Sequence, residues 1–103
     1  MYELVERARR LEDLMVGHVT GTWQTSDDEY RELRRLLMSQ PKLHRLLPDF
    51  VRECRDLRAF WDLMKSKTST YRERRALIRG AFAGLLDALD ADQNHPSDES
   101  LLS

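Results

Sequence analysis

The chain has 103 residues, 41% of them hydrophobic and 34% charged, with a formal net charge of −1 at pH 7. This length suits one domain with one core, and there is no run of about twenty apolar residues that would span a membrane. The single cysteine cannot form an internal disulfide, which fits a reducing compartment, so we expect a cytoplasmic protein.

The first segment carries apolar residues at helical spacing. They form one stripe, composed of Leu4, Ala8, Leu11, Met15 and Val19. Charged residues occupy most of the opposite face, so the pattern predicts an amphipathic helix over residues 2–18. A polar loop is expected over residues 20–25. Within this loop, Trp23 is expected either to fold back over the core or to be an exposed contact residue.

A second helix is predicted to begin after Ser26. Residues 26–29, SDDE, match a capping box, in which Ser26 caps free backbone N–H groups and Glu29 reaches back to the N-cap. The acidic residues also lie at the positive end of the helix dipole. The expected buried stripe continues to about Ser39 and consists of Tyr30, Leu33, Leu36 and Leu37.

Three shorter helices are predicted in the middle of the chain. Pro41 suits the first turn of a helix over residues 42–46, and Pro48 suits the start of the next one. That second helix would carry Phe50, Val51 and Cys54. Asp56 fits the N-cap of a third helix. Its expected inward residues are Leu57, Phe60, Trp61 and Met64.

Residues 70–73, TYRE, form a second capping box at the start of the last helix. Its expected core stripe is Ile78, Phe82, Leu85 and Leu89, and its small residues, expected to allow close approach of a neighbouring helix, are Ala81, Ala83 and Gly84. All 17 Lys and Arg lie in residues 1–80 beside 13 acids, whereas residues 81–103 hold five acids and no base. We therefore expect one helical domain over residues 1–90 and an acidic disordered tail or linker over residues 91–103.

These elements predict an all-α fold, a compact bundle of five to six short helices. Nothing in the sequence indicates catalysis. His18, His44 and His95 lack metal-ligand spacing, and the four glycines are too scattered for a phosphate-binding loop. Cys54 could meet His44 in space, but a lone cysteine among apolar residues is more often a core residue. We expect no enzymatic activity, no metal and no cofactor.

Charged clusters are the remaining candidates for function. Acids gather at the start of the second helix, and arginines on the second and last helices. The candidate interface residues are Asp27, Asp28, Glu29, Arg31, Arg34, Arg35, Arg72, Arg74 and Arg75. A solvated helical face is the default interpretation of each cluster. The sharper interpretation is a set of patches of opposite sign that bind protein, including copies of the same domain head to tail.

Several stretches of residues 26–90 form a recognisable pattern. They are YRELRR at 30–35, LLPDFV at 46–51, CRDL at 54–57, FW at 60–61, KSK at 65–67 and YRERR at 71–75. Together they resemble the helical N-terminal adaptor domains of bacterial anti-phage defence proteins, of the abortive-infection type and of the effector-associated, death-fold (CARD-like) type, including gasdermin-associated ones. The resemblance implies a six-helix Greek-key bundle that joins proteins through like-with-like contacts.

The resemblance favours a non-catalytic adaptor or oligomerisation domain that recruits or assembles an effector in bacterial anti-phage immunity. Its partner would be protein, either a copy of the same domain or a different one, with no membrane contact. One alternative is a domain that binds nucleic acid through its arginine-rich helices, against which the near-neutral net charge and the acidic tail both count. A free-standing small regulatory protein is the other alternative.

Overall fold

The structure is a computed structural model that describes residues 2–22 and 24–102, without the side chains of Tyr2 and of residues 92–102. It contains five α-helices and one 3-10 helix, which are α1 (Tyr2–Thr20), α2 (Asp27–Met38), η1 (Pro41–Leu43), α3 (Asp49–Glu53), α4 (Leu57–Lys67) and α5 (Tyr71–Leu102). No β-strand occurs in these ranges, so the predicted all-α bundle is confirmed. Trp23, for which two positions were expected, lies outside the described residues.

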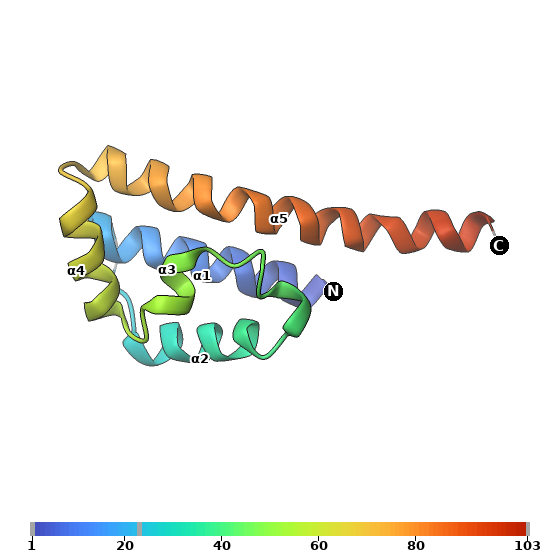
Figure 1. Cartoon of the computed structure of the whole chain (residues 1–103), viewed down its shortest axis with the longest axis horizontal. Helices are drawn as coiled ribbons and strands as arrows, with labels where there is room; N and C mark the ends of the chain where they lie inside the picture. The colour runs from blue at the N-terminus through green and yellow to red at the C-terminus, as the bar shows by residue number, and fades with distance from the viewer. Residues whose placement is uncertain (1, 23, 103) are drawn as a thin grey trace.

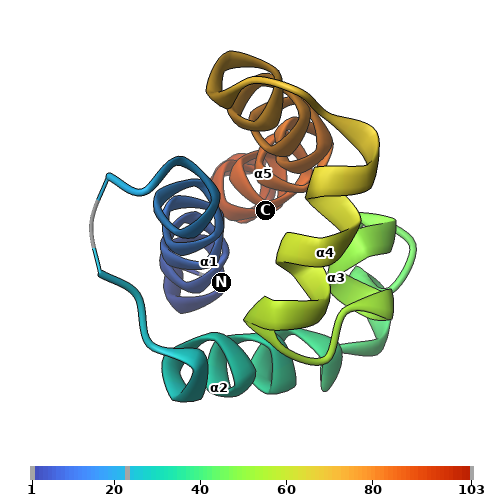
Figure 2. The same ribbon diagram turned by 90° about the vertical axis from the view of Figure 1, so that its left-hand side faces the viewer.

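The N-terminal helix is the most enclosed element of the bundle. α1 packs most extensively along α5 and also contacts α2 and α4, as Figures 1 and 2 show from two directions. The predicted stripe is buried together with Val5 and Leu14, which flank it in the sequence pattern, and Val16 is buried in addition. The helix runs two residues further than predicted, to Thr20, and Gly21 then reverses the chain with a φ of 69°.

The core is one continuous cluster to which every helix contributes. The ring of Phe50 in α3 lies 5.4 Å from that of Phe60 in α4 and 6.2 Å from that of Phe82 in α5, measured between centroids. The buried Tyr30 hydroxyl donates to the backbone carbonyl of Cys54 at 2.6 Å. The predicted core stripe of α5 is confirmed, since Ile78, Phe82, Leu85 and Leu89 are all buried.

The predicted helix starts are correct, but one of the two capping boxes forms only in part. At α5 the box is complete, because Glu73 N–H donates to Thr70 Oγ1 and Thr70 N–H donates to Glu73 Oε1, both at 3.1 Å. At α2 the Glu29 N–H donates to Ser26 Oγ at 3.2 Å. Both carboxylate oxygens of Glu29, however, accept hydrogen bonds from Arg10 of α1. A contact between helices therefore replaces the local half of this box.

Several local expectations are wrong. Residues 42–46 do not form an α-helix. The segment is the 3-10 helix η1 followed by turns, because the N–H groups of Leu43, His44 and Leu46 donate to carbonyls three residues earlier in the chain. Leu36 and Trp61 are half-buried rather than core residues. Ala83 and Gly84 are exposed, and a Cβ added at Gly84 would meet nothing within 4 Å. These two small residues therefore face solvent and mediate no close helix approach within the chain.

The last helix continues well past its core residues. α5 is 32 residues long, and its backbone stays helical to Leu102, through the segment for which the sequence predicted a disordered tail or linker. Figure 1 shows this part extending beyond the other helices, at the opposite end of the molecule from the connection between α4 and α5. The principal-axis extents of 51 × 25 × 23 Å reflect this elongation.

Candidate protein-interaction surface

The one combination of residue types that suggested nucleophilic chemistry is not assembled. Cys54 is buried, and burial raises the pKa of its thiol. His44 is exposed, and its Nε2 hydrogen bonds with the carbonyl of Met38 at 2.8 Å. No group of three or more His, Cys, Asp or Glu side chains within the described ranges is placed to hold a metal ion. No described helix has an apolar stretch long enough to cross a membrane.

The predicted acidic residues divide between internal and exposed roles. Asp27 accepts a hydrogen bond from the Leu57 N–H at 2.8 Å and forms an ion pair with Arg31, whose Nε lies 2.7 Å away. Arg31 also lies 3.8 Å from Asp56. These contacts fasten the start of α2 to the start of α4. Asp28, one residue further, is exposed, and its side chain has no hydrogen bond or ion pair with another described residue.

Glu29 is also an internal residue. Its carboxylate pairs with Arg10 through two hydrogen bonds, from Nε at 2.6 Å and from Nη2 at 3.0 Å. The hydrogen bond from Arg10 lowers the pKa of Glu29 below its ordinary value. The bidentate pair links α1 to α2, so Glu29 contributes to the bundle and is not available as an isolated charge.

The neighbouring arginines Arg34 and Arg35 have different environments. Arg34 is half-buried and donates to the carbonyls of Val51 and Arg52, both at 2.8 Å, so it caps the C-terminal end of α3. Arg35 is exposed and pairs with Glu32 on the same helix. The sequence alone does not distinguish the two, because both occur in one polar stretch of α2.

Arg74 has the densest set of contacts among the predicted arginines. Its guanidinium carbon lies 4.7 Å from the ring centroid of Trp61 and 5.4 Å from that of Tyr71. Its Nε donates to Thr68 Oγ1 at 3.1 Å, and Nη1 approaches the carbonyl of Val19 at 3.4 Å. The guanidinium therefore stacks on two aromatic rings while it connects α5 to the C-terminal end of α1.

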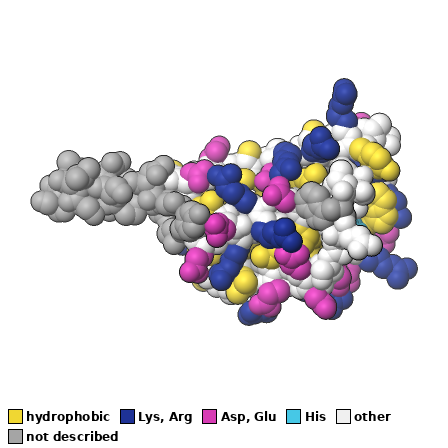
Figure 3. Space-filling view, turned by 180° about the vertical axis from the view of Figure 1, so that it is seen from behind, with side chains coloured by type: hydrophobic (Ala, Val, Ile, Leu, Met, Phe, Trp, Pro, Cys, Tyr) yellow, Lys and Arg dark blue, Asp and Glu magenta, His cyan; other side chains and the backbone are white. Residues whose placement is uncertain are grey.

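Around this stack lies a surface that we call the basic corner. It is located where α4 meets α5 and consists of Trp61, Lys65, Lys67, Tyr71, Arg72, Arg74 and Arg75. A hollow of about 500 Å³ opens there, lined by Trp61, Ser69, Thr70, Tyr71 and Arg74. Tyr71 is 63% exposed. Figure 3 shows hydrophobic side chains at the surface of this end of the molecule, beside projecting Lys and Arg side chains.

Apart from Arg74, the cations of the basic corner have few internal partners. Lys65 pairs with Asp62 at 3.5 Å and lies 5.4 Å from the Trp61 ring. Lys67, Arg72 and Arg75 are exposed and have no ion pair with another described residue. Residues 57–79 hold seven Lys and Arg against two Asp and Glu. This end of the bundle is therefore positively charged and available to a partner.

A second hollow of about 500 Å³ lies on the other side of Trp61 and has a different character. It is lined by His18, Thr25, Asp27, Arg31, Asp56, Leu57, Arg58 and Trp61. Its charges largely pair with one another, as the contacts of Arg31 show. The His18 ring meets Trp61 edge-on with 6.3 Å between centroids, and its Nδ1 hydrogen bonds with Thr25 Oγ1 at 2.8 Å. The self-paired charges make this hollow the weaker candidate.

Of the nine predicted interface residues, three belong to the basic corner, namely Arg72, Arg74 and Arg75. Asp27 and Arg31 also lie together, but they pair with each other in the second hollow. The structure adds Trp61 and Tyr71, which the sequence analysis did not propose as contact residues. The helical spacing of Trp61 indicated a core position, yet its neighbour Phe60 occupies the core. One signal in the sequence could have indicated this surface: Trp61 precedes the basic stretch KSK and Tyr71 follows it.

We compared the chain with protein families, with curated proteins and with solved structures, and none of the three comparisons finds a match. The function of the basic corner therefore has to be inferred from its own geometry and charge.

Proposed function

We propose that this chain is a non-catalytic protein-interaction domain that binds its partner through the basic corner. The observation that carries the proposal is the surface stack of Trp61, Arg74 and Tyr71. Trp, Tyr and Arg are the residue types that most often dominate the binding energy of protein interfaces. An aromatic and cationic surface next to a hollow suits a partner that combines apolar and acidic groups.

The combination of unpaired cations with aromatic surface supports this choice. Elsewhere on the bundle, Arg9, Arg10 and Arg79 pair with carboxylates of the chain itself. Arg45, Arg55 and Arg58 are exposed without an ion pair to another described residue. At the basic corner, exposed cations adjoin a half-buried indole and an exposed phenol. Removing this apolar surface from water would favour association, and the cations would select an acidic partner.

The adaptor role is proposed on the resemblance of residues 26–90. That resemblance implies a death-fold-like Greek key of six helices, and the five α-helices together with η1 provide six helical segments in a chain of suitable length. We therefore propose a cytoplasmic adaptor that recruits or assembles an effector in bacterial anti-phage defence. Its mechanism would be shape and charge complementarity, without chemistry in this domain.

Affinity capture with matched variants tests the interaction surface. The protein would be immobilised and exposed to a lysate of the host organism, and bound proteins would be quantified by mass spectrometry. The test variant, which we call the corner variant, is Arg72→Glu with Arg75→Glu. The control is Arg45→Glu with Arg55→Glu, which changes the net charge by the same amount at exposed arginines outside the basic corner. Circular dichroism would verify that both variants fold.

We expect the wild type and the control variant to retain the same partner, and the corner variant to lose it. Retention of the same proteins by all three forms would show that the basic corner is not the binding surface.

A further inference from the structure

Charge is segregated along the long axis of the molecule. The basic corner lies at the end where α5 begins, and the five acids of residues 81–103, without any base, lie toward the end where α5 finishes. An α-helix rises about 1.5 Å per residue, so Asp87 lies about 18 Å and Glu99 about 36 Å along α5 from Arg75. A continuous helix also keeps the acidic segment of one chain away from its own basic corner.

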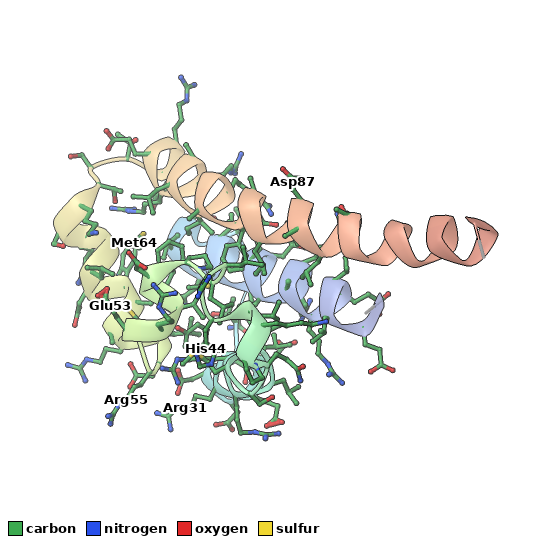
Figure 4. The ribbon with its side chains drawn as sticks, turned by 45° about the vertical axis from the view of Figure 1, so that its right-hand side comes forward. Arg31, His44, Glu53, Arg55, Met64 and Asp87 are labelled. Atoms are coloured by element: carbon green, nitrogen blue, oxygen red, sulfur yellow. The ribbon has the colours of Figure 1, made fainter. Side chains whose placement is uncertain are left out.

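The acidic end is accessible to another molecule. Asp87 is exposed and has no ion pair with another described residue, and Figure 4 shows it pointing away from the bundle on the outer side of α5. Asp90 interacts with Arg9 at 3.4 Å, with both side chains partly exposed. The sequence then adds Asp92, Asp98 and Glu99. The helix dipole adds negative potential at this end and positive potential at the corner.

We propose that the basic corner binds the acidic segment of a second copy of this chain, residues 87–99. The inference rests on the function proposed above and names its partner. Lys67, Arg72 and Arg75 would pair with the carboxylates, while the hollow beside Trp61 and Tyr71 would receive apolar atoms of the segment. Each copy offers one corner and one acidic segment, so the contact is heterologous and propagates head to tail into open chains or rings.

Charge complementarity favours this occupant over nucleic acid, which would also meet a basic surface with aromatic side chains. The acidic segment belongs to every copy and would repel a phosphate backbone, and the net charge of the whole chain is −1. We therefore expect the basic corner to bind the acidic segment rather than a phosphate backbone, and the test below distinguishes the two.

The test is the molar mass of the purified protein, measured by light scattering across protein concentration at 50 mM and 500 mM NaCl. We expect mass that increases with concentration beyond that of a dimer, and an apparent affinity that falls by at least about tenfold at the higher salt concentration. The corner variant, Arg72→Glu with Arg75→Glu, and the tail variant, Asp98→Lys with Glu99→Lys, should each be monomeric under conditions where the wild type assembles.

Mixing the two variants distinguishes a head-to-tail contact from a symmetric one. The intact corner of the tail variant should bind the intact tail of the corner variant, so the mixture should form complexes that neither variant forms alone. A chain that carries all four substitutions should assemble again. The control variant, Arg45→Glu with Arg55→Glu, has the same charge change as the corner variant and should assemble like the wild type.

Three results would overturn the inference: a wild type that stays monomeric at all concentrations, a tail variant that assembles like the wild type, or a mixture of the two variants that stays monomeric. A monomer that binds a single-stranded DNA probe through the corner would assign this surface to phosphates. If the wild type is monomeric and capture from the lysate still depends on the corner, the proposed function stands and only the self-assembly fails.

Discussion

The guanidinium of Arg74 lies over the indole of Trp61, with 4.7 Å between its central carbon and the ring centroid. The same side chain reaches Thr68 and the carbonyl of Val19, so it spans the ends of α4 and α1 from the first turn of α5. Arg74 therefore supports the surface to which it belongs. The adjacent exposed arginines have no such contacts, which separates residues that shape the corner from residues that are free to meet a partner.

Replacing Arg74 by alanine should lower the free energy of unfolding by about 1 to 2 kcal/mol, since a cation–π contact and hydrogen bonds from a charged donor are lost together. Arg75→Ala, one residue away and exposed, should leave the urea midpoint unchanged. The fluorescence of Trp61, followed in a Trp23→Phe background, should shift to longer wavelength only in the Arg74 variant. Equal midpoints for the two variants would contradict the stacking role.

Arg34 and Arg35 should respond differently to the same substitution. Arg34→Ala leaves the carbonyls of Val51 and Arg52 without their donor, and we expect a loss of about 1 to 2 kcal/mol in the free energy of unfolding. Arg35 makes only an exposed pair with Glu32, so Arg35→Ala should leave the urea midpoint unchanged. Similar losses from both variants would mean that the cap on α3 contributes nothing.

Asp27 and Asp28 provide a second matched pair. Both lie in the first turn of α2 and share the interaction with the helix dipole, but only Asp27 accepts the Leu57 N–H. Asp27→Ala should therefore cost about 1 kcal/mol more than Asp28→Ala in urea denaturation. The amide proton of Leu57 should also exchange faster in the Asp27 variant alone, and its unchanged protection would refute the proposed link between α2 and α4.

The buried hydroxyl of Tyr30 offers a test of the core. Tyr30→Phe removes the donor to the Cys54 carbonyl, which should destabilise the fold by about 1 to 3 kcal/mol. Burial raises the pKa of Tyr30, so its phenol should ionise only when alkali unfolds the protein. Tyr71→Phe alters an exposed ring and should leave the Tm unchanged in thermal denaturation. A neutral Tyr30→Phe variant would show that water satisfies the carbonyl equally well.

Stability should decrease as the pH falls through the titration range of His18. Burial lowers the pKa of His18 in the folded state, although Asp27 partly opposes this shift. The unfolded chain therefore takes up a proton first, and stability is lost as the pH falls below about 6.5 until the folded-state pKa is passed. His18→Gln should reduce the dependence of the free energy of unfolding on pH between pH 7.5 and 5.5, measured by urea denaturation. If this free energy changes with pH equally in both proteins, His18 does not contribute to the pH dependence.

Glu12 has the opposite linkage to that of His18. Burial raises the pKa of its carboxyl group more than the ion pair with Arg79 lowers it. The folded state then binds the proton more tightly, so this group favours stability as the pH falls from above its raised pKa toward its ordinary value. Glu12 is present in both the wild type and the His18 variant. Its contribution therefore cancels when the free energy of unfolding of one protein is subtracted from that of the other.

The features that the sequence predicted correctly depend on neighbours a few residues apart. The N-caps at Ser26 and Asp56 and the stripe from Ile78 to Leu89 follow from local backbone geometry and helical periodicity. The roles of Asp27 and Arg34 depend on partners 30 and 17 residues away in the chain. A single sequence does not show whether a polar residue has such a distant partner. For this reason the candidate site was predicted only at Arg72, Arg74 and Arg75.

The pairing of α1 with α5 has a consequence for how the protein acquires its structure during synthesis. The apolar face of α1 emerges from the ribosome before α5, the helix that packs most extensively against it, has been translated. Folding should therefore be a single step after release of the helix that completes the core, with no stable N-terminal intermediate. A nascent chain that stops before α5 is complete would expose α1 to chaperones and proteases.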